Sequence, residues 1–209
     1  MIKNKPKMNL FVDVDGVVLD CITVICKLYN KNFCNHKDFI TAIPSKVSCW
    51  DFSNQCPLCK NEDSGNSKLI EEWFGSEEFW DIANDIKPTK DSINALKILS
   101  SKYNITFCSI GSSKNISYKA LWLNKFFPDY NQILIKNNNC TMDKSCVNME
   151  NSIFIDDNMR NLETSNAKYK FIFGELYDWN RAWTEDIHSK QDGRLHDWSE
   201  VVQTLMNIE

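Results

Sequence analysis

Residues 10–16 read Leu-Phe-Val-Asp-Val-Asp-Gly, and this stretch decides the fold that we expect for the chain. The apolar run from Leu10 to Val14 predicts a short strand that is buried on both faces, as in a parallel sheet. Asp13 and Asp15 should point to the same side because side chains alternate along a strand, and Gly16 allows a sharp turn. The sequence therefore predicts two carboxylates at the edge of a sheet, an arrangement that suits Mg²⁺.

A lone Asp-x-Asp is also typical of an acidic turn after a strand, because turns favour Asp and Gly. An EF-hand calcium loop that starts at Asp13 is excluded, since the chain has valine at the positions where such a loop needs Gly and Glu. A second apolar strand, Ser-Ile-Phe-Ile at 152–155, also ends in two carboxylates, Asp156 and Asp157. Two acidic strand ends that converge in one sheet favour a metal site over a turn.

The composition limits the class of protein. A chain of 209 residues is one domain, or one domain with a modest insertion. The net charge is −4 and the two signs of charge are interleaved, which disfavours binding to duplex nucleic acid or to an anionic membrane. The basic N-terminus is followed by an apolar run that Asp13 and Asp15 interrupt, so we expect no signal peptide and no membrane span. We expect a cytoplasmic protein.

The chain contains nine cysteines. Without an export signal, most of them should be reduced thiols that pack as small hydrophobic residues, as expected for Cys21, Cys26 and Cys108. Cys56 and Cys59 nevertheless have the spacing of a zinc knuckle. A tetrahedral zinc site needs two further ligands, for which the candidates are Cys34, His36 and Cys49. We favour unliganded thiols and leave the zinc site open.

Hydrophobic periodicity predicts an α/β fold in which strands alternate with helices. The expected strands are Leu10–Val14, Asn104–Ser109, Gln132–Ile135, Ser152–Ile155 and Tyr169–Phe173. The expected helices are Val17–Phe33, Lys68–Phe74, Ser76–Ala83, Thr89–Lys102, Asn115–Phe127, a short helix from Arg160, and Trp198–Met206. Residues 34–66 have little periodicity and indicate an irregular insertion. This alternation implies a parallel sheet covered by helices on both faces, with ligands at the carboxyl ends of its strands.

Four features in this order resemble the haloacid dehalogenase (HAD) superfamily. They are Asp-Val-Asp-Gly at 13–16, the strand-end hydroxyl of Ser109, a lysine before the fourth strand, and Ile-Asp-Asp at 155–157. Further segments resemble the 5'(3')-deoxyribonucleotidase branch: Glu78-Phe-Trp80, Ile86-Lys-Pro88, Phe107-Cys-Ser109, Lys119-Ala-Leu-Trp122, Tyr177-Asp-Trp-Asn180 and Asp197-Trp198. The resemblance covers most of the chain outside residues 30–66. It implies a Rossmann-like core at 1–19 and 86–209, with a small, mostly helical cap at 20–85.

The resemblance implies Mg²⁺-dependent hydrolysis of a small phosphate monoester, most simply a nucleotide. Asp13 would be the nucleophile that takes the phosphoryl group. Asp15 would protonate the leaving alcohol and then activate water. The implied metal ligands are Asp13, Asp15 through its main-chain carbonyl, Asp156 and Asp157.

Phosphate oxygens would be held by Ser109 and by backbone amides of the loop that starts at Ile110. A serine there is also typical of a turn cap, and only its place among the other features favours a phosphate role. The nucleotidase branch usually carries two hydroxyl residues and a proline after this strand, whereas this chain continues with Ile110 and Gly111. Ser112 or Ser113 would therefore have to supply the second hydroxyl.

Three lysines are candidates for neutralising the phosphate charge. Lys144 ranks first because it stands where the superfamily's lysine precedes the acidic strand. Lys119 ranks second because it matches a lysine of the nucleotidase branch, and Lys136 we expect to be a solvated surface residue.

The substrate is the least constrained part of this prediction, because the cap selects it and the cap is poorly matched. A HAD phosphatase for another small phosphate ester stays open, as does a nucleic-acid end phosphatase, which the acidic charge disfavours. A catalytically silent binding module on the same fold is the alternative outside the enzymes, and the intact Asp15 disfavours it. The aromatic residues of the cap should mostly pack it, and Phe33 or Trp50 are the candidates for stacking on a nucleobase instead. A homodimer also stays open.

Overall fold

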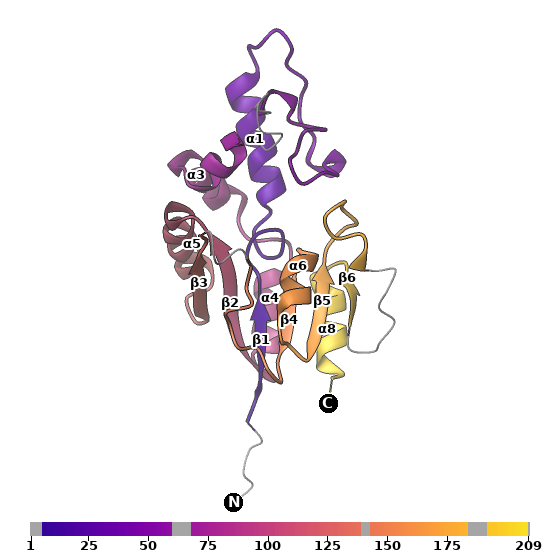
Figure 1. Cartoon of the computed structure of the whole chain (residues 1–209). Coiled ribbons are helices and arrows are strands. Elements are labelled where there is room, and N and C mark those ends of the chain that lie inside the picture. The colour runs from indigo at the N-terminus through magenta and orange to yellow at the C-terminus, as the bar shows by residue number, and fades with distance from the viewer. Residues whose placement is uncertain (1–5, 60–67, 139–142, 184–191, 209) are drawn as a thin grey trace, which may run out of the picture.

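The computed structural model describes residues 6–59, 68–138, 143–183 and 192–208. Within them, six strands form one all-parallel sheet in the order β3-β2-β1-β4-β5-β6 (Figure 1). The strands are β1 (Met8–Val12), β2 (Tyr103–Gly111), β3 (Asn131–Lys136), β4 (Ile153–Asp156), β5 (Tyr169–Phe173) and β6 (Asp192–Leu195). The predicted α/β fold is confirmed. Because the strand order reverses between β1 and β4, a crevice forms at their carboxyl ends.

The helices are α1 (Cys21–Phe33), α2 (Lys68–Phe74), α3 (Glu77–Ile86), α4 (Ser92–Leu99), α5 (Ser113–Phe126), α6 (Met159–Thr164) and α8 (Trp198–Met206). Two short 3-10 turns, η1 (Pro44–Lys46) and η2 (Pro57–Cys59), lie between α1 and α2. Figure 1 shows α1 and α3 beyond the carboxyl end of the sheet, so a helical insertion follows the first strand as predicted. The boundaries of the cap at 20 and 85 stay a prediction.

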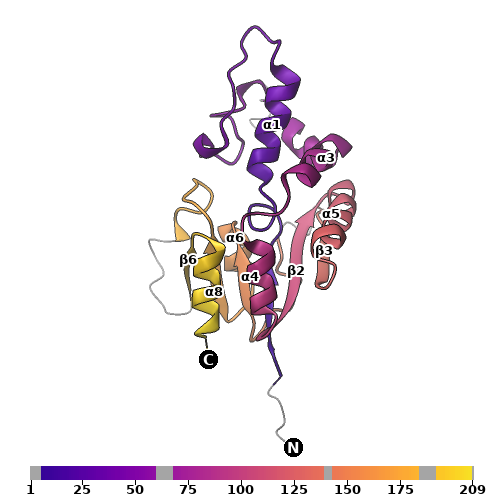
Figure 2. The same cartoon turned by 180° about the vertical axis from the view of Figure 1, so that it is seen from behind.

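Helices cover both faces of the sheet. Figure 2 shows α4 and α8 side by side on one face, and Figure 1 shows α6 on the other. Alternate residues of β1 serve the two faces: Leu10 and Val12 belong to the larger hydrophobic cluster and Phe11 to the smaller one. Because both faces are buried, a central strand must be apolar throughout, which is the pattern that predicted it. The larger cluster continues through α1 and α3 into the insertion.

The segment after β1 differs from the prediction. The backbone carbonyl of Val14 accepts a hydrogen bond from the N–H of Leu19 at 2.8 Å, so a tight loop follows the strand. Gly16 supplies the turn with a φ of 71°. The Asp20 carboxylate then caps α1, accepting from the backbone N–H three residues on at 3.0 Å. The predicted helix start at Val17 is therefore wrong, because apolar residues buried in a loop can mimic helical spacing.

The other elements agree with the prediction to within a few residues, except β6. This strand pairs in parallel with β5 and was not predicted. Its sequence, Asp-Gly-Arg-Leu, lacks the alternating apolar pattern of a strand. Within the described part of the chain, no helix combines the length and apolarity that crossing a membrane requires.

Buried aromatic residues pack the helices of the insertion against one another. Phe79 of α3 is fully buried, with its ring centroid 4.9 Å from that of Phe74. We expect Phe79→Ala to lower the free energy of unfolding by about 3–5 kcal/mol, since it removes a buried ring and leaves a cavity. Urea denaturation measures this. The control is Ile93→Ala on α4, which is 47% exposed and should change stability by less than about 0.5 kcal/mol. Equal losses would contradict the packing described.

Candidate active site

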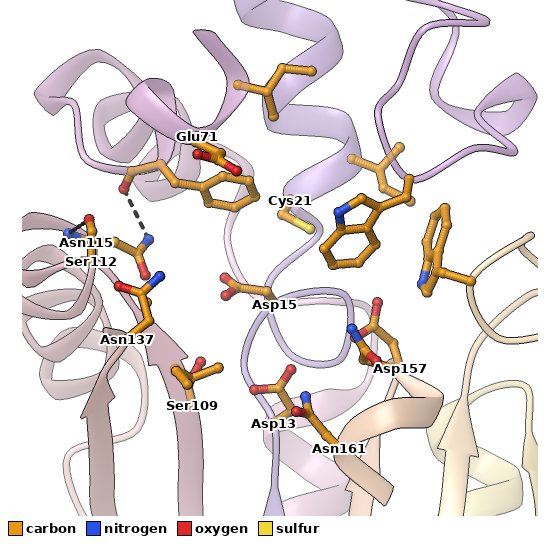
Figure 3. Close-up of a pocket in the computed structure, with 18 of the residues that line it drawn as sticks. Asp13, Asp15, Cys21, Glu71, Ser109, Ser112, Asn115, Asn137, Asp157 and Asn161 are labelled. Carbon is orange, nitrogen blue, oxygen red and sulfur yellow. Dashed lines mark hydrogen bonds between the residues drawn. The ribbon is translucent and has the colours of Figure 1, made fainter. Parts of the chain in front are cut away.

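A cavity of about 420 Å³ lies between the carboxyl end of the sheet and the insertion (Figure 3). Its volume lies in the range of roughly 300–1,000 Å³ that is typical of small-molecule sites. Asp13, Asp15, Ser109 and Asp157 line it from the strand ends and the loops after them. The apolar part of the opposite wall, from the insertion, consists of Cys21, Ile22, Trp50, Phe52, Ile70 and Phe74.

Carboxylates from two distant segments meet at the floor of this cavity. One oxygen from each of Asp13, Asp156 and Asp157 lies within 4.8 Å of the other two. The backbone N–H of Asp13 donates to the carbonyl of Ile155 at 2.9 Å, which holds the ends of β1 and β4 together. Asp13 and Asp156 are buried. Buried oxygen donors in this number could hold a hard divalent cation.

Lys144 lies between two of these carboxylates. Its Nζ is 2.6 Å from Asp13 Oδ1 and 2.5 Å from Asp156 Oδ2, and its side chain is only 1% exposed. Burial opposes the charged form, but the two carboxylates outweigh burial and raise the pKa of Lys144. One lysine among three carboxylates leaves an excess of negative charge, which a divalent cation would balance.

Lys119 reaches the site from α5. Its fully buried Nζ is 2.5 Å from Asp15 Oδ2 and donates to Ser109 Oγ at 2.8 Å. Burial and the charge of Asp13 raise the pKa of Asp15, although Lys119 works in the opposite direction. Lys136, at the end of β3, is exposed and does not line the cavity. The structure thus brings two of the three candidate lysines to the acidic residues.

The loop after β2 also reaches the cavity. Ser109 is 1% exposed, and Ile110 lines the cavity with it. Ser112 Oγ accepts a hydrogen bond from the backbone N–H of Asn115 at 3.3 Å and so caps α5. Ser112 and Asn115 both line the cavity, as does Asn137 after β3 (Figure 3). Neither asparagine was predicted, because an amide in the first turn of a helix or in a loop has no periodic signal.

Two further asparagines that sequence reasoning missed hold the second acidic pair. Asn161 Nδ2 donates to both carboxylate oxygens of Asp156, at 3.2 and 3.1 Å. Asn180, which is fully buried, donates to the main-chain carbonyl of Asp157 at 3.3 Å. Asn161 follows the acidic pair on the next helix, a spacing that could have found it. Asn180 belongs to the segment 177–180, which the resemblance singled out without a role.

Gly16 lets the first acidic loop approach the second. A Cβ at this position would lie 2.4 Å from Asp157 Oδ2, closer than any side chain allows. Its φ of 71° is also one that favours glycine. Burial, together with the charges of Asp156 and Asp13, raises the pKa of Asp157 well above its usual range.

Two aromatic residues join the insertion to the core beside the cavity. The Trp50 ring from the insertion packs edge-on against Trp179, with 5.6 Å between the ring centroids. Both rings line the cavity, and Trp50 is still 62% exposed. Phe33, the other residue considered for base stacking, packs on Tyr29 at 5.1 Å and does not line the cavity.

The two cysteines with the spacing of a zinc knuckle lie elsewhere in the insertion. Cys56 and Cys59 are buried and do not line the cavity. A hydrogen bond with Cys26 and burial raise the pKa of Cys56, and burial raises the pKa of Cys59 to about 12. Among the described residues, the group of side chains arranged for a metal is the aspartate cluster. Unliganded thiols at this pair stay a prediction, and the zinc site stays open.

Comparisons with known proteins agree with this geometry. The model of the family "5' nucleotidase, deoxy (Pyrimidine), cytosolic type C protein" matches residues 7–208. No curated protein matches the chain significantly.

Solved structures share the fold at low identity. One of them is a protein of Lactobacillus delbrueckii subsp. bulgaricus that is named provisionally as a phosphoglycolate phosphatase. It has 10% identity and a TM-score of 0.60, and the match covers 98% of this chain and 100% of that protein. A haloacid dehalogenase-like hydrolase of Streptococcus pneumoniae has 13% identity and a TM-score of 0.58, and the match covers 95% of this chain and 98% of that protein. A HAD-superfamily hydrolase of Geobacter sulfurreducens has 12% identity and a TM-score of 0.52, and the match covers 95% of this chain and 96% of that protein.

The buried carboxylates should make stability depend on pH when no metal is present. Burial raises the pKa of Asp156 to about 7, with the charge of Asp13 adding to the effect and Lys144 opposing it. The folded state therefore keeps a proton that the unfolded state releases above its usual value of 3.8. This contribution to stability is complete at low pH and is lost as the pH rises through about 7.

In EDTA, we accordingly expect the unfolding temperature to fall by several degrees between about pH 5 and pH 8. Thermal unfolding followed by circular dichroism measures this. Asp156→Asn should weaken the pH dependence, because the amide does not ionise. An unfolding temperature that rises over this range, or an Asp156→Asn variant with the full wild-type slope, would contradict the burial of this carboxyl.

Proposed function

Since the chain belongs to the 5' nucleotidase, deoxy (pyrimidine), cytosolic type C family of HAD-type phosphatases, we propose that it hydrolyses pyrimidine deoxynucleoside monophosphates with Mg²⁺. The observation that carries the proposal is the meeting of Asp13, Asp156 and Asp157 around Lys144 at the floor of the cavity. We also propose a cytosolic location, which rests on the family's name.

The donor set suits Mg²⁺. The ion prefers carboxylate and carbonyl oxygens, and the cluster offers oxygen ligands alone. The ligands that we propose are Asp13, Asp156 and Asp157 through their carboxylates and Asp15 through its main-chain carbonyl. When bound, Mg²⁺ would reduce the repulsion between a carboxylate nucleophile and the phosphate group.

Asp13 is the proposed nucleophile. A carboxylate oxygen of Asp13 attacks phosphorus and forms an aspartyl phosphate, while the bond from phosphorus to the ester oxygen breaks. Lys144, 2.6 Å from Asp13, fixes the orientation of this carboxylate. The Ser109 hydroxyl and the backbone amide of Ile110 hold phosphate oxygens. Lys119, which contacts Ser109, adds positive charge on the same side.

Asp15 is the proposed acid and base. Its raised pKa favours the protonated form, which donates its proton to the leaving ester oxygen and yields the nucleoside. The Asp15 carboxylate then takes a proton from the water that attacks the aspartyl phosphate. That step releases inorganic phosphate and restores Asp13. Lys119 Nζ holds Asp15 from the side of α5, so the acid is positioned by a group outside its own loop.

Asp13→Asn should abolish phosphate release from deoxynucleoside 5'-monophosphates, by on the order of 10³-fold or more, because an amide cannot attack phosphorus. EDTA should abolish the wild-type activity and Mg²⁺ should restore it. A malachite-green assay for inorganic phosphate measures both effects. The control is Asp85→Asn, an exposed residue of α3 outside the cavity, which should keep wild-type activity. Wild-type turnover in Asp13→Asn would exclude the covalent mechanism.

Asp15→Asn should separate the two steps. An aryl phosphate such as p-nitrophenyl phosphate has a good leaving group, so the first step needs no proton from Asp15. We expect a burst of about one equivalent of p-nitrophenol per enzyme, followed by slow turnover as the aspartyl phosphate accumulates. Stopped-flow absorbance measures the burst. Equal loss on aryl and alkyl esters, with no burst, would contradict the role of Asp15.

A further inference from the structure

The wall of the cavity that faces Asp13 carries apolar and acidic side chains. Its polar groups from the insertion are the carboxylates of Asp51 and Glu71, and no lysine or arginine of the described residues lines it there. Figure 3 shows Glu71 on the side of the insertion, across the cavity from Asp13 and Asp15. A nucleotide whose phosphate lies at Asp13 must extend its other end, the base, toward this wall.

Of the two carboxylates of this wall, Glu71 is the one for which the described residues supply no ion-pair or hydrogen-bond partner. Asp51 Oδ1 already accepts a hydrogen bond from the backbone N–H of Ser53 at 3.0 Å. Glu71 is exposed on α2 and forms no ion pair with any described residue, since Lys68 of the same helix pairs with Glu72 at 3.8 Å. An unpaired anion in the cavity of an enzyme whose substrate is itself an anion raises the electrostatic cost of binding, unless it accepts a hydrogen bond from that substrate.

Aromatic rings stand on the same wall. Phe74, at the end of α2, and Trp50 line the cavity with Glu71, and Trp50 keeps most of its indole exposed. Aromatic rings that line a cavity are platforms for the flat face of a base. A base that lies against such a ring presents its edge to the polar groups of the wall, and the edge is where bases differ from one another.

We propose that Glu71 selects cytosine, so that the substrate is deoxycytidine monophosphate. The carboxylate accepts a hydrogen bond from the exocyclic amino group of cytosine, the pairing that acidic side chains make with this base. Uracil and thymine carry a carbonyl oxygen at that position, which has no proton to donate and is repelled by the anion. Discrimination therefore comes from rejection of the carbonyl bases as well as from attraction of cytosine. This inference rests on the proposed nucleotidase function.

The test compares kcat/KM for dCMP and dUMP, which share the sugar and the phosphate. They differ at position 4, an amino group against a carbonyl oxygen, and at N3, which carries a proton only in uracil. We expect the wild-type protein to favour dCMP by about tenfold or more, as for a hydrogen bond to a charged group. Glu71→Gln should lower kcat/KM for dCMP and raise it for dUMP, because an amide can donate to the carbonyl. The control is Glu72→Gln, the same charge change on the next residue of α2, outside the cavity, which should leave the ratio unchanged.

The outcomes distinguish this inference from the proposed function. Equal use of dCMP and dUMP by the wild-type protein, or an unchanged ratio in Glu71→Gln, overturns the role of Glu71 and leaves the nucleotidase standing. Hydrolysis of neither nucleotide with Mg²⁺ overturns both. If Glu71→Gln loses both activities, Glu71→Asp decides the question: a retained preference for dCMP supports the inference, and a lost preference overturns it.

Discussion

A buried lysine held between two carboxylates is the interaction on which the site depends. Lys144 Nζ lies within 2.6 Å of Asp13 and 2.5 Å of Asp156, so it joins the end of β1 to the end of β4. Removing one partner of such a buried pair costs about 3–5 kcal/mol, because the remaining charge has no compensation. The same contacts keep the carboxylates of Asp13 and Asp156 close together. Lys144 therefore both stabilises the carboxyl end of the sheet and positions the side chains of the site.

The sequence predicts the sheet and its acidic strand ends because both follow from burial. A strand covered on two faces must be apolar, and a carboxylate directly after it can only lie at the strand's end. Other features follow from contacts that are distant in the chain. The short β6 pairs with β5, and the amide of Asn180 bonds to the carbonyl of Asp157, so the periodicity of their own segments does not predict them.

The residues of the site also divide into those that the local sequence predicts and those that depend on distant contacts. Asp13, Asp15, Asp156 and Asp157 are predicted from their places at the ends of two strands. The structure brings Asp13, Asp15 and Asp157 to one cavity, with Asp156 buried next to Asp13 and Asp157. The ranking of the lysines came from a resemblance, since a buried lysine cannot be told from a solvated one by sequence alone. The wall of the insertion is least predictable, because Trp50 lies in a segment without regular structure and packs against Trp179 of the core.

Gly16 affects how closely the two acidic loops approach each other. An added methyl group would overlap the Asp157 carboxylate, so either this side chain or the loop of Gly16 would have to move. The two acidic loops can thus lie this close because glycine has no Cβ. Gly16, which has no side chain, therefore allows the loop that carries Asp13 and Asp15 to lie against the Asp157 carboxylate.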